Sequence, residues 1–288
     1  MVQKFTVFVR DLFLKSLVLD YMTLKTGSLN YFQKADLLFK KYPLIIKFLF
    51  LKNYFEAGKT KTKLFGNDHY FDSRYGLAGI QTAFTSIYNH LAFLKNQPSL
   101  TVIDIGANVG NFSLLVSTAF DVKKLISIEP IPDIYNCLVL NTKNIKNITT
   151  INCAICDEIG SKNMSFDKEK GYLSRFTEDV EQSVIVDTLT LDNIIETFNI
   201  SKVDLLKIDV EGFENLVLDG AKNNLKNIKY IMIEMNLKDN PNYTISSIFS
   251  KLYSSDFDFE VISINTYGGK FENITITDFI LENRKFIK

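Results

Sequence analysis

The sequence predicts an α/β fold with a mostly parallel sheet, preceded by a helical extension. After Pro98, short apolar runs alternate with helical patterns, which indicates parallel strands joined by crossover helices. Before Pro98, apolar residues recur every three or four positions, as in amphipathic helices. We therefore divide the chain into a helical extension with a connecting segment, residues 1–79, and an α/β domain, residues 80–288.

The extension is basic and apolar. Residues 1–63 contain twelve Lys and Arg against four acidic residues, a local charge of +8, whereas the whole chain has 33 of each and is formally neutral. Such a segment can lie on an anionic membrane surface or form a helical cap with solvated lysines, and the cap is preferred. Residues 58–79 are predicted to connect the two parts. Their His69, Arg74 and Tyr75 are candidates for a lid, although a structural role is preferred.

The composition excludes several classes of protein. Lys15 and Lys47 interrupt the longest apolar runs, which fall short of the about 18 residues that suggest a transmembrane helix. The first residues lack a signal-peptide pattern, and three cysteines fit a reducing compartment, with Cys153 and Cys156 as buried thiols. A neutral chain is also a poor match for nucleic acid. We expect a cytoplasmic protein, with the inner membrane surface as a peripheral location.

Seven strands are predicted in the α/β domain. Five are expected to be parallel, namely Thr101–Asp104, Lys124–Glu129, Ile148–Ala154, Val203–Asp209 and Tyr230–Glu234. The last two, Phe257–Ile264 and Asp278–Arg284, are expected to form an antiparallel pair. Residues 80–94 have a helical pattern, and residues 159–186 predict an inserted loop or a small hairpin.

A glycine-containing turn follows the first strand. Residues 102–113 predict a strand, a turn and then a helix that begins near Asn111, whose first amides face a ligand. Gly106 allows a tight turn close to a ligand, and Gly110 permits close contact of helix and strand. Asn108 stands where the dinucleotide fingerprint has its second glycine, which argues against a pyrophosphate.

Two acids accompany this turn. Asp104 directly precedes it and is placed to pair with an ammonium group, which S-adenosylmethionine (SAM) carries. Glu129 ends the second strand, the position from which an acid accepts hydrogen bonds from a ribose diol. Dinucleotide enzymes place an acid there too, so Glu129 indicates a ribose without identifying the cofactor.

Four charged residues are expected at the ends of two later strands. The period of two places Lys207, Asp209 and Glu211 on one side of their strand, and Glu234 ends the next strand. Such charges are costly near a buried strand end unless they are paired. An ion pair between Lys207 and Asp209 is one interpretation, but four charges at the ligand edge favour a functional site.

With these motifs in order, residues 98–236 resemble the FkbM family of SAM-dependent methyltransferases. The similar segments are residues 102–110, 128–130, 151–157, 188–192 and 206–212. The most specific are the last two, Thr-Leu-Thr-Leu-Asp and Leu-Lys-Ile-Asp-Val-Glu-Gly. The resemblance implies a Rossmann-like class I methyltransferase fold with seven strands, the final one antiparallel. It also implies O-methylation of a hydroxyl group on a sugar or secondary metabolite.

The resemblance implies the cofactor contacts as well, including a loop after the third strand that lines the adenine. With the helix start included, the predicted SAM-binding residues are Asp104, Gly106, Asn108, Gly110, Asn111, Glu129, Asn152 and Ala154. Residues 1–97 lie outside the resemblance, so the part that selects the acceptor is not carried over.

Methyl transfer to a hydroxyl group requires alignment of the acceptor oxygen and loss of its proton. We expect Asp209 or Glu211 to act as the base, oriented by Lys207, with Glu234 completing the catalytic group. The same carboxylates are suitable ligands for Mg²⁺, which would acidify a bound hydroxyl group. The metal-free version is preferred.

Two other functional classes remain open. One is an NAD-type Rossmann oxidoreductase, against which Asn108 counts. The other is a non-catalytic SAM-binding module in a glycan-assembly complex, against which the charged strand ends count. The expected partner is a hydroxyl-bearing small molecule or a glycan acceptor.

Overall fold

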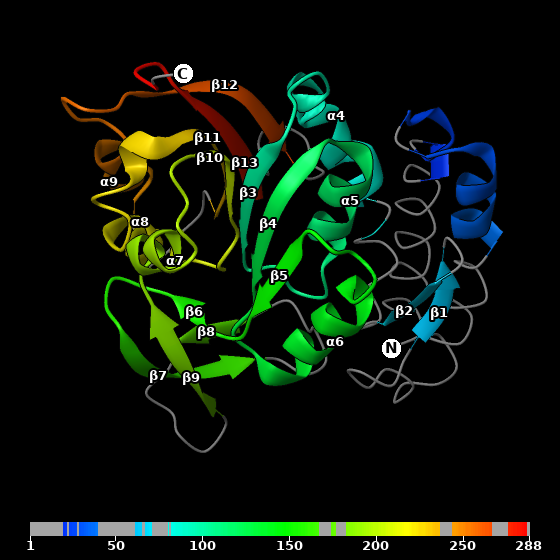
Figure 1. Ribbon diagram of the computed structural model, residues 1–288, viewed down its shortest axis with the longest axis horizontal. Coiled ribbons are helices and arrows are strands. Elements are labelled where there is room, and N and C mark those ends of the chain that lie inside the picture. The colour runs from blue at the N-terminus through cyan, green and yellow to red at the C-terminus, as the bar shows by residue number, and fades with distance from the viewer. Residues whose placement is uncertain are drawn as a thin grey trace, which may run out of the picture.

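The computed structural model describes most of the α/β domain and parts of the extension (Figure 1). The described residues are 20–21, 23–27, 29–39, 61–64, 67–70, 80, 82–166, 174–176, 183–236, 244–266 and 276–286. Within the extension, residues 31–39 are helical, and β1 (Lys61–Leu64) and β2 (Asn67–Tyr70) form an antiparallel hairpin. Arg74 and Tyr75 lie outside the described residues.

A seven-stranded sheet forms the centre of the α/β domain, in the order β12-β13-β11-β10-β3-β4-β5. Its strands are β3 (Leu100–Ile105), β4 (Val122–Ile128), β5 (Ile148–Ile151), β10 (Val203–Ile208), β11 (Ile228–Asn236), β12 (Phe259–Thr266) and β13 (Ile276–Asn283). β13 is antiparallel to both of its neighbours, β11 and β12, and the other neighbouring strands of the sheet pair in parallel. The predicted sheet, mostly parallel with an antiparallel final strand, is confirmed.

Helices cover both faces of this sheet (Figure 1). One face packs against α7 (Leu191–Thr197), α8 (Glu214–Asp219) and α9 (Ile245–Lys251). The other packs against α5 (Asn111–Ala119) and the helical turns η1 (Ala83–Ile87), α4 (Tyr88–His90) and η2 (Ala92–Leu94). The alternation within β3 shows the two layers, because Ile103 faces the first group and Val102 the second.

Residues 29–37 of the extension pack on this second layer. Leu29 and Leu37 are buried in one apolar cluster with Phe84 and with Leu115 of α5. The predicted helix over residues 80–94 is therefore present, but it contains a π-helical segment and ends in a 3₁₀ turn. No described helix has both the length and the apolar character to cross a membrane.

A second, four-stranded sheet stands where an inserted loop or hairpin was expected. Its strands are β6 (Ala154–Ile155), β7 (Gly160–Phe166), β8 (Ser174–Phe176) and β9 (Ser183–Leu189), in the order β6-β9-β7-β8. The predicted strand over residues 148–154 was too long, because β5 ends at Ile151 and Ala154 pairs with β9 instead. Asn152 and Cys153 connect the two sheets.

Candidate functional site

The glycine turn joins β3 to α5, and neighbouring chain segments approach its glycines too closely for a side chain. Gly106 and Gly110 have φ values of +74° and +93°, a region that favours glycine. A Cβ on Gly106 would collide with the main-chain carbonyl of Asp209, and a Cβ on Gly110 would lie 2.9 Å from Leu138 Cδ1 of α6 (Pro132–Thr142). The reasons given from the sequence for these two glycines were therefore incomplete. Gly106 packs against the end of β10, and Gly110 packs against a second helix.

Asp104 lies beneath this turn and is fully buried. Ser113 Oγ donates a 2.6 Å hydrogen bond to Asp104 Oδ2, and Lys207 Nζ lies 3.4 Å from Asp104 Oδ1. Burial raises the pKa of Asp104, although Lys207 and Ser113 both favour its ionised form. The structure thus places a lysine of the same chain where a ligand ammonium group was expected, and the carboxylate has no exposed surface for the ligand.

Lys207 links the turn to the acidic strand ends. Its side chain, 8% exposed, lies 3.0 Å from Asp209 Oδ2 and donates to the Gly106 carbonyl oxygen at 3.3 Å. Because Lys207 pairs with Asp104 in the register of β10 and β3, both side chains emerge on the same face. Burial by itself would lower the pKa of Lys207, but Asp209 and Asp104 outweigh it and raise that pKa. The lysine therefore stays charged.

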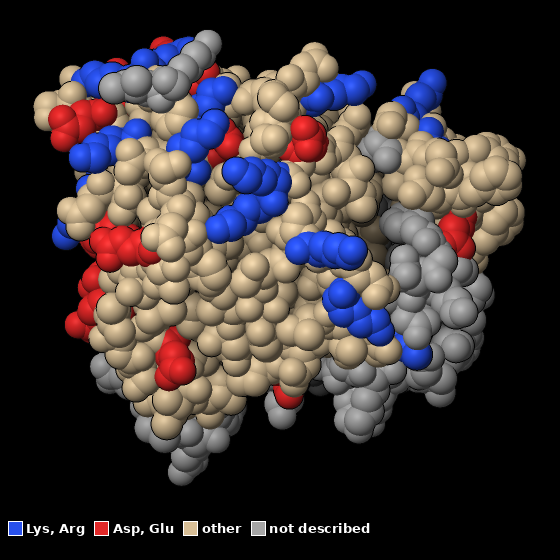
Figure 2. Space-filling model, in the orientation of Figure 1, with Lys and Arg blue, Asp and Glu red and all other residues tan. Residues whose placement is uncertain are grey.

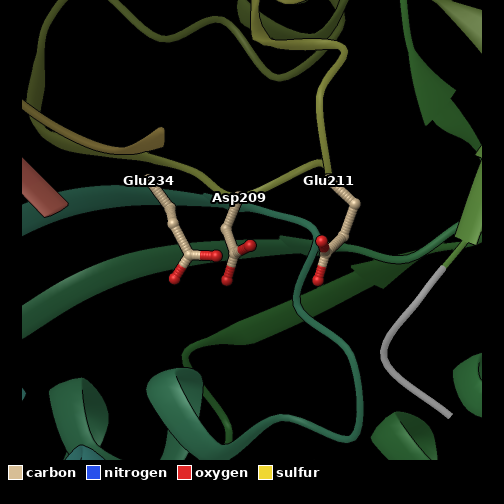
Figure 3. A group of neighbouring side chains, drawn as sticks. All are labelled: Asp209, Glu211 and Glu234. Carbon is tan, nitrogen blue, oxygen red and sulfur yellow. The ribbon is translucent and has the colours of Figure 1, made fainter. Parts of the chain in front are cut away.

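Three carboxylates point the same way from the ends of β10 and β11 (Figure 3). One oxygen from each of Asp209, Glu211 and Glu234 lies within 4.8 Å of the other two, and all three residues are half-buried. Burial, followed by the charges of Asp209, Asp278 and Glu211, raises the pKa of Glu234 well above its ordinary value, while Lys207 opposes this shift. This group, which we call the carboxylate group, can take up a proton or hold a divalent cation.

Asp278 helps to raise the pKa of Glu234, and the sequence analysis did not identify it. It is 2% exposed and lies opposite Glu234 in the antiparallel register of β11 and β13. Asn265 Nδ2 donates to Asp278 Oδ2 at 3.2 Å, and Ser86 Oγ donates to Asn265 Oδ1 at 3.2 Å. Only the cross-strand register brings these residues together, so no local pattern indicates them.

Two predicted site residues have backbone conformations that non-glycine residues seldom adopt. Asn108 has φ +50° and Glu211 has φ +52°. Asparagine tolerates this region, and here Asn108 Oδ1 accepts a 2.7 Å hydrogen bond from the main-chain amide of Val109. For glutamate the conformation costs on the order of 1 kcal/mol or more. The fold therefore fixes Glu211 against its local preference, as is common in functional sites.

Glu129 follows β4 and organises the neighbouring loops. It is 4% exposed, and its carboxylate accepts 3.0 Å hydrogen bonds from the main-chain amides of Asn108 and Ile131. Asn152 Nδ2 donates to the Glu129 carbonyl oxygen at 2.8 Å. Ala154 is buried in β6. The structure thus brings Glu129, Asn108 and Asn152 together, and their contact with a ribose or an adenine remains a prediction.

Asn111 begins α5, and no side chain caps this helix. His69 is buried beside it, which lowers the pKa of His69 to about 4 although a hydrogen bond with the Asn111 side chain opposes the shift. His69 is thus a neutral, interior residue next to the glycine turn. His90 Nδ1 lies 3.0 Å from Ser263 Oγ.

The strand order, with the glycine turn after β3 and an acid after β4, defines a Rossmann-like fold of the class I methyltransferase type. A family model described as the methyltransferase FkbM domain matches residues 104–262, more than half of the chain. The chain belongs to the FkbM family of methyltransferases.

Two curated relatives show what the chain is similar to. Hexuronic acid methyltransferase AglP from Haloferax volcanii is 28% identical over 140 residues, covering 48% of this chain and 56% of that protein. 31-O-demethyl-FK506 methyltransferase FkbM from Streptomyces tacrolimicus is 24% identical over 178 residues, covering 49% of this chain and 68% of that protein. The match to AglP thus spans little more than half of that protein.

Solved structures are more distant. Trm5b from Pyrococcus abyssi has a TM-score of 0.46 at 12% identity, covering 78% of this chain and 56% of that one. Magnesium protoporphyrin IX methyltransferase from Synechocystis has a TM-score of 0.45 at 12% identity, covering 72% of this chain and 84% of that one. At these values the fold assignment depends on the strand order and the family match.

Proposed function

We propose that this chain is a SAM-dependent O-methyltransferase that acts on a hydroxyl group of a sugar, a glycan or a similar small molecule. The carboxylate group carries this proposal, because it adjoins the glycine turn where Gly106 packs against the main chain of Asp209. A cofactor held at the turn and a proton acceptor at the strand ends would therefore share one edge of the sheet. The relatives' names support oxygen acceptors, since one specifies a hexuronic acid and another a 31-O-demethyl substrate.

The residues around the turn fit the polar groups of SAM. No side chain caps α5, so its first main-chain amides suit the cofactor carboxylate. We place the ribose diol at Glu129, the acid after β4, whose carboxylate also accepts the main-chain amides of Asn108 and Ile131. Asn152 and Ala154 occupy the loop and strand after β5, where we place the adenine. When bound, SAM supplies an electrophilic methyl group.

Removal of the acceptor proton falls to the carboxylate group. Three carboxylates crowded together resist full ionisation, so the group takes up a proton more readily than an isolated carboxylate. A general base needs this property near neutral pH. Lys207 fixes Asp209 through its 3.0 Å contact, and either Asp209 or Glu211 accepts the proton.

The test measures transfer of a labelled methyl group from SAM to a panel of uronic acids, neutral sugars and hydroxylated macrocycles. Removing the base, by Asp209→Asn or Glu211→Gln, should lower kcat by about 10²- to 10⁴-fold. Asp219→Asn provides the control, because Asp219 pairs with Lys251 away from this group. Binding of S-adenosylhomocysteine (SAH) without transfer to any hydroxyl acceptor would favour the non-catalytic binding module.

A metal-assisted version makes a different prediction. The oxygens of the carboxylate group are close enough to share one divalent cation. We propose the metal-free version, in which EDTA leaves the transfer rate unchanged. Loss of turnover with EDTA and its return with Mg²⁺ would establish the metal-assisted version instead.

We further propose that the extension contacts an anionic membrane surface near lipid-linked acceptors. On the helix of residues 31–39, Tyr31, Phe32 and Phe39 are 80%, 81% and 80% exposed, while Leu37 is buried on the opposite side. This part of the surface, at the upper right of Figure 2, is mostly uncharged. Exposed aromatic residues within a segment of charge +8 suit an interface with acidic lipids.

Vesicle flotation tests this contact. The full chain should float with phosphatidylglycerol vesicles at low salt and stay behind with phosphatidylcholine vesicles. Phe32→Ser with Phe39→Ser should abolish flotation, and Ile185→Ser, at a residue of β9 that is 71% exposed, should not. A wild-type chain that stays in the soluble fraction with both vesicles would remove the basis of this proposal.

A further inference from the structure

The β1–β2 hairpin of the extension lies against α6, on the side of the glycine turn (Figure 1). Asn141 of α6 makes the connection. Its Oδ1 accepts a 2.7 Å hydrogen bond from the Tyr70 main-chain amide, and its Nδ2 donates to the Tyr70 carbonyl oxygen at 2.9 Å. The same Nδ2 donates to the Val109 carbonyl oxygen of the glycine turn at 2.8 Å. One amide side chain therefore binds the hairpin and the turn together.

Apolar packing reinforces the same junction. Val109 is buried in a cluster with Ile134 and Cys137 of α6, and Tyr70 packs against this cluster. His69, the residue before Tyr70, is buried beside Asn111 at the start of α5. Both residues at the end of β2 thus contact the segment in which the cofactor-binding amides are expected.

The junction is at a sensitive place in the turn. The Val109 carbonyl lies between Asn108 and Gly110, which both have positive φ. Asn and Gly can adopt positive φ, but an isolated chain would also populate other conformations, so the shape of this short turn depends on its surroundings. A donor fixed on a helix and directed at the carbonyl between them restricts rotation of that peptide plane.

We propose that Asn141 is a positioning residue, which holds the glycine turn in its cofactor-binding shape by fastening it to the β1–β2 hairpin. This inference rests on the proposed function for the identity of the cofactor. It makes part of the extension a structural component of the cofactor site, whereas the sequence suggested a connecting segment there, with His69 as a lid candidate.

The experiment compares Asn141→Ala with Asn147→Ala. Asn147 also donates a side-chain hydrogen bond to a main-chain carbonyl, that of Val122, but at the opposite ends of the strands. Two measurements are made on each full-length variant: hydrogen exchange of the amides in residues 106–111 and at Tyr70, and calorimetric binding of SAH.

Asn141→Ala removes three hydrogen bonds, one of them to the glycine turn, and the loss of one neutral hydrogen bond changes an equilibrium by about three- to tenfold. Asn141→Ala should accelerate exchange in the turn and at Tyr70 by that factor and weaken SAH binding equally, whereas Asn147→Ala should change neither. Two results would overturn the proposal. One is a hydrogen-exchange rate in the turn of Asn141→Ala equal to that of the wild type, and the other is a loss of SAH binding in Asn147→Ala as large as in Asn141→Ala. If the wild-type chain binds no SAH, the proposed function fails, and the exchange data still decide the role of Asn141.

Discussion

The glycine turn and the carboxylate group lie side by side at one edge of the sheet, but they differ in how their charged groups are paired. Beneath the turn, Asp104 has Ser113 and Lys207 as partners, and Glu129 accepts two main-chain amides. At the strand ends, three carboxylates crowd together with Asp278 close behind. The acids near the glycine turn are paired with groups of the same chain, whereas the carboxylate group keeps an excess of negative charge.

Under the proposed function, this difference suits the two regions to separate tasks. Satisfied hydrogen bonds fix a shape before a ligand arrives, which suits cofactor binding. Crowded carboxylates raise the affinity for a proton, which suits its removal from an acceptor. Lys207 belongs to both, because it lies between Asp104 and Asp209. The predictions below alter one region at a time.

Lys207→Met should have the largest effect on stability. The change leaves Asp104 fully buried without its cation, and removing one partner of a buried ion pair typically costs about 3–5 kcal/mol. Urea unfolding followed by circular dichroism measures the loss. Lys251→Met is the control, because its pair with Asp219 is partly exposed and should contribute about 1 kcal/mol or less.

A double variant shows whether the unpaired charge of Asp104 causes the loss of stability in Lys207→Met. Adding Asp104→Asn to Lys207→Met should restore part of the lost stability, since no buried carboxylate then lacks a partner. Equal stability of the double and single variants would contradict the assignment of Lys207 as the counter-ion of Asp104.

His69 provides a test on the side of the glycine turn. Its folded pKa of about 4 lies below the ordinary 6.5, so between these values the unfolded chain binds a proton that the folded chain does not. Stability should therefore fall by up to about 3 kcal/mol as the pH drops from 6.5 to 4. His69→Gln should flatten this slope in urea unfolding curves.

The only other histidine gives the matched comparison. His90→Gln should change the slope less, because His90 is half-buried and bonded to Ser263. If His69→Gln and the wild type lose stability in parallel over this range, His69 is not an interior neutral residue.

Glu234→Gln should give a smaller effect of opposite sign, specific to the carboxylate group. Its folded pKa is raised, so above the unfolded value of 4.5 the folded chain holds a proton that the unfolded chain releases. The contribution of Glu234 to stability should therefore decline as the pH rises through this window, opposite to the contribution of His69, and the variant should lack this decline. Its urea midpoint at pH 7 should exceed that of the wild type, whereas Glu196→Gln, on the exposed surface of α7, should not differ.

Sequence patterns anticipated the sheet and the convergence of four charges, because both depend on periodicity within single strands. Alternation placed Lys207 and Asp209 on one side, and their side chains do meet. The partners of Asp104 and Glu234 were not anticipated. Ser113 reaches Asp104 from a helix, and Asp278 reaches Glu234 through an antiparallel register that follows a long connection.

The β1–β2 hairpin and the second sheet escaped prediction for a related reason. The strands of the hairpin have only four residues each and β6 only two, and β6 pairs with β9 although more than twenty-five residues separate them in the chain. Local propensity does not encode such pairs. Asn141 is likewise an ordinary helix residue in the sequence, and only packing brings it to Val109.

The most direct test of the central claim is calorimetric titration of the wild-type chain with SAH and, separately, with NAD. Our account predicts one SAH bound per chain and no heat from NAD, since Asn108 stands where the dinucleotide fingerprint has the glycine that admits a pyrophosphate. Tight binding of NAD without binding of SAH would contradict it.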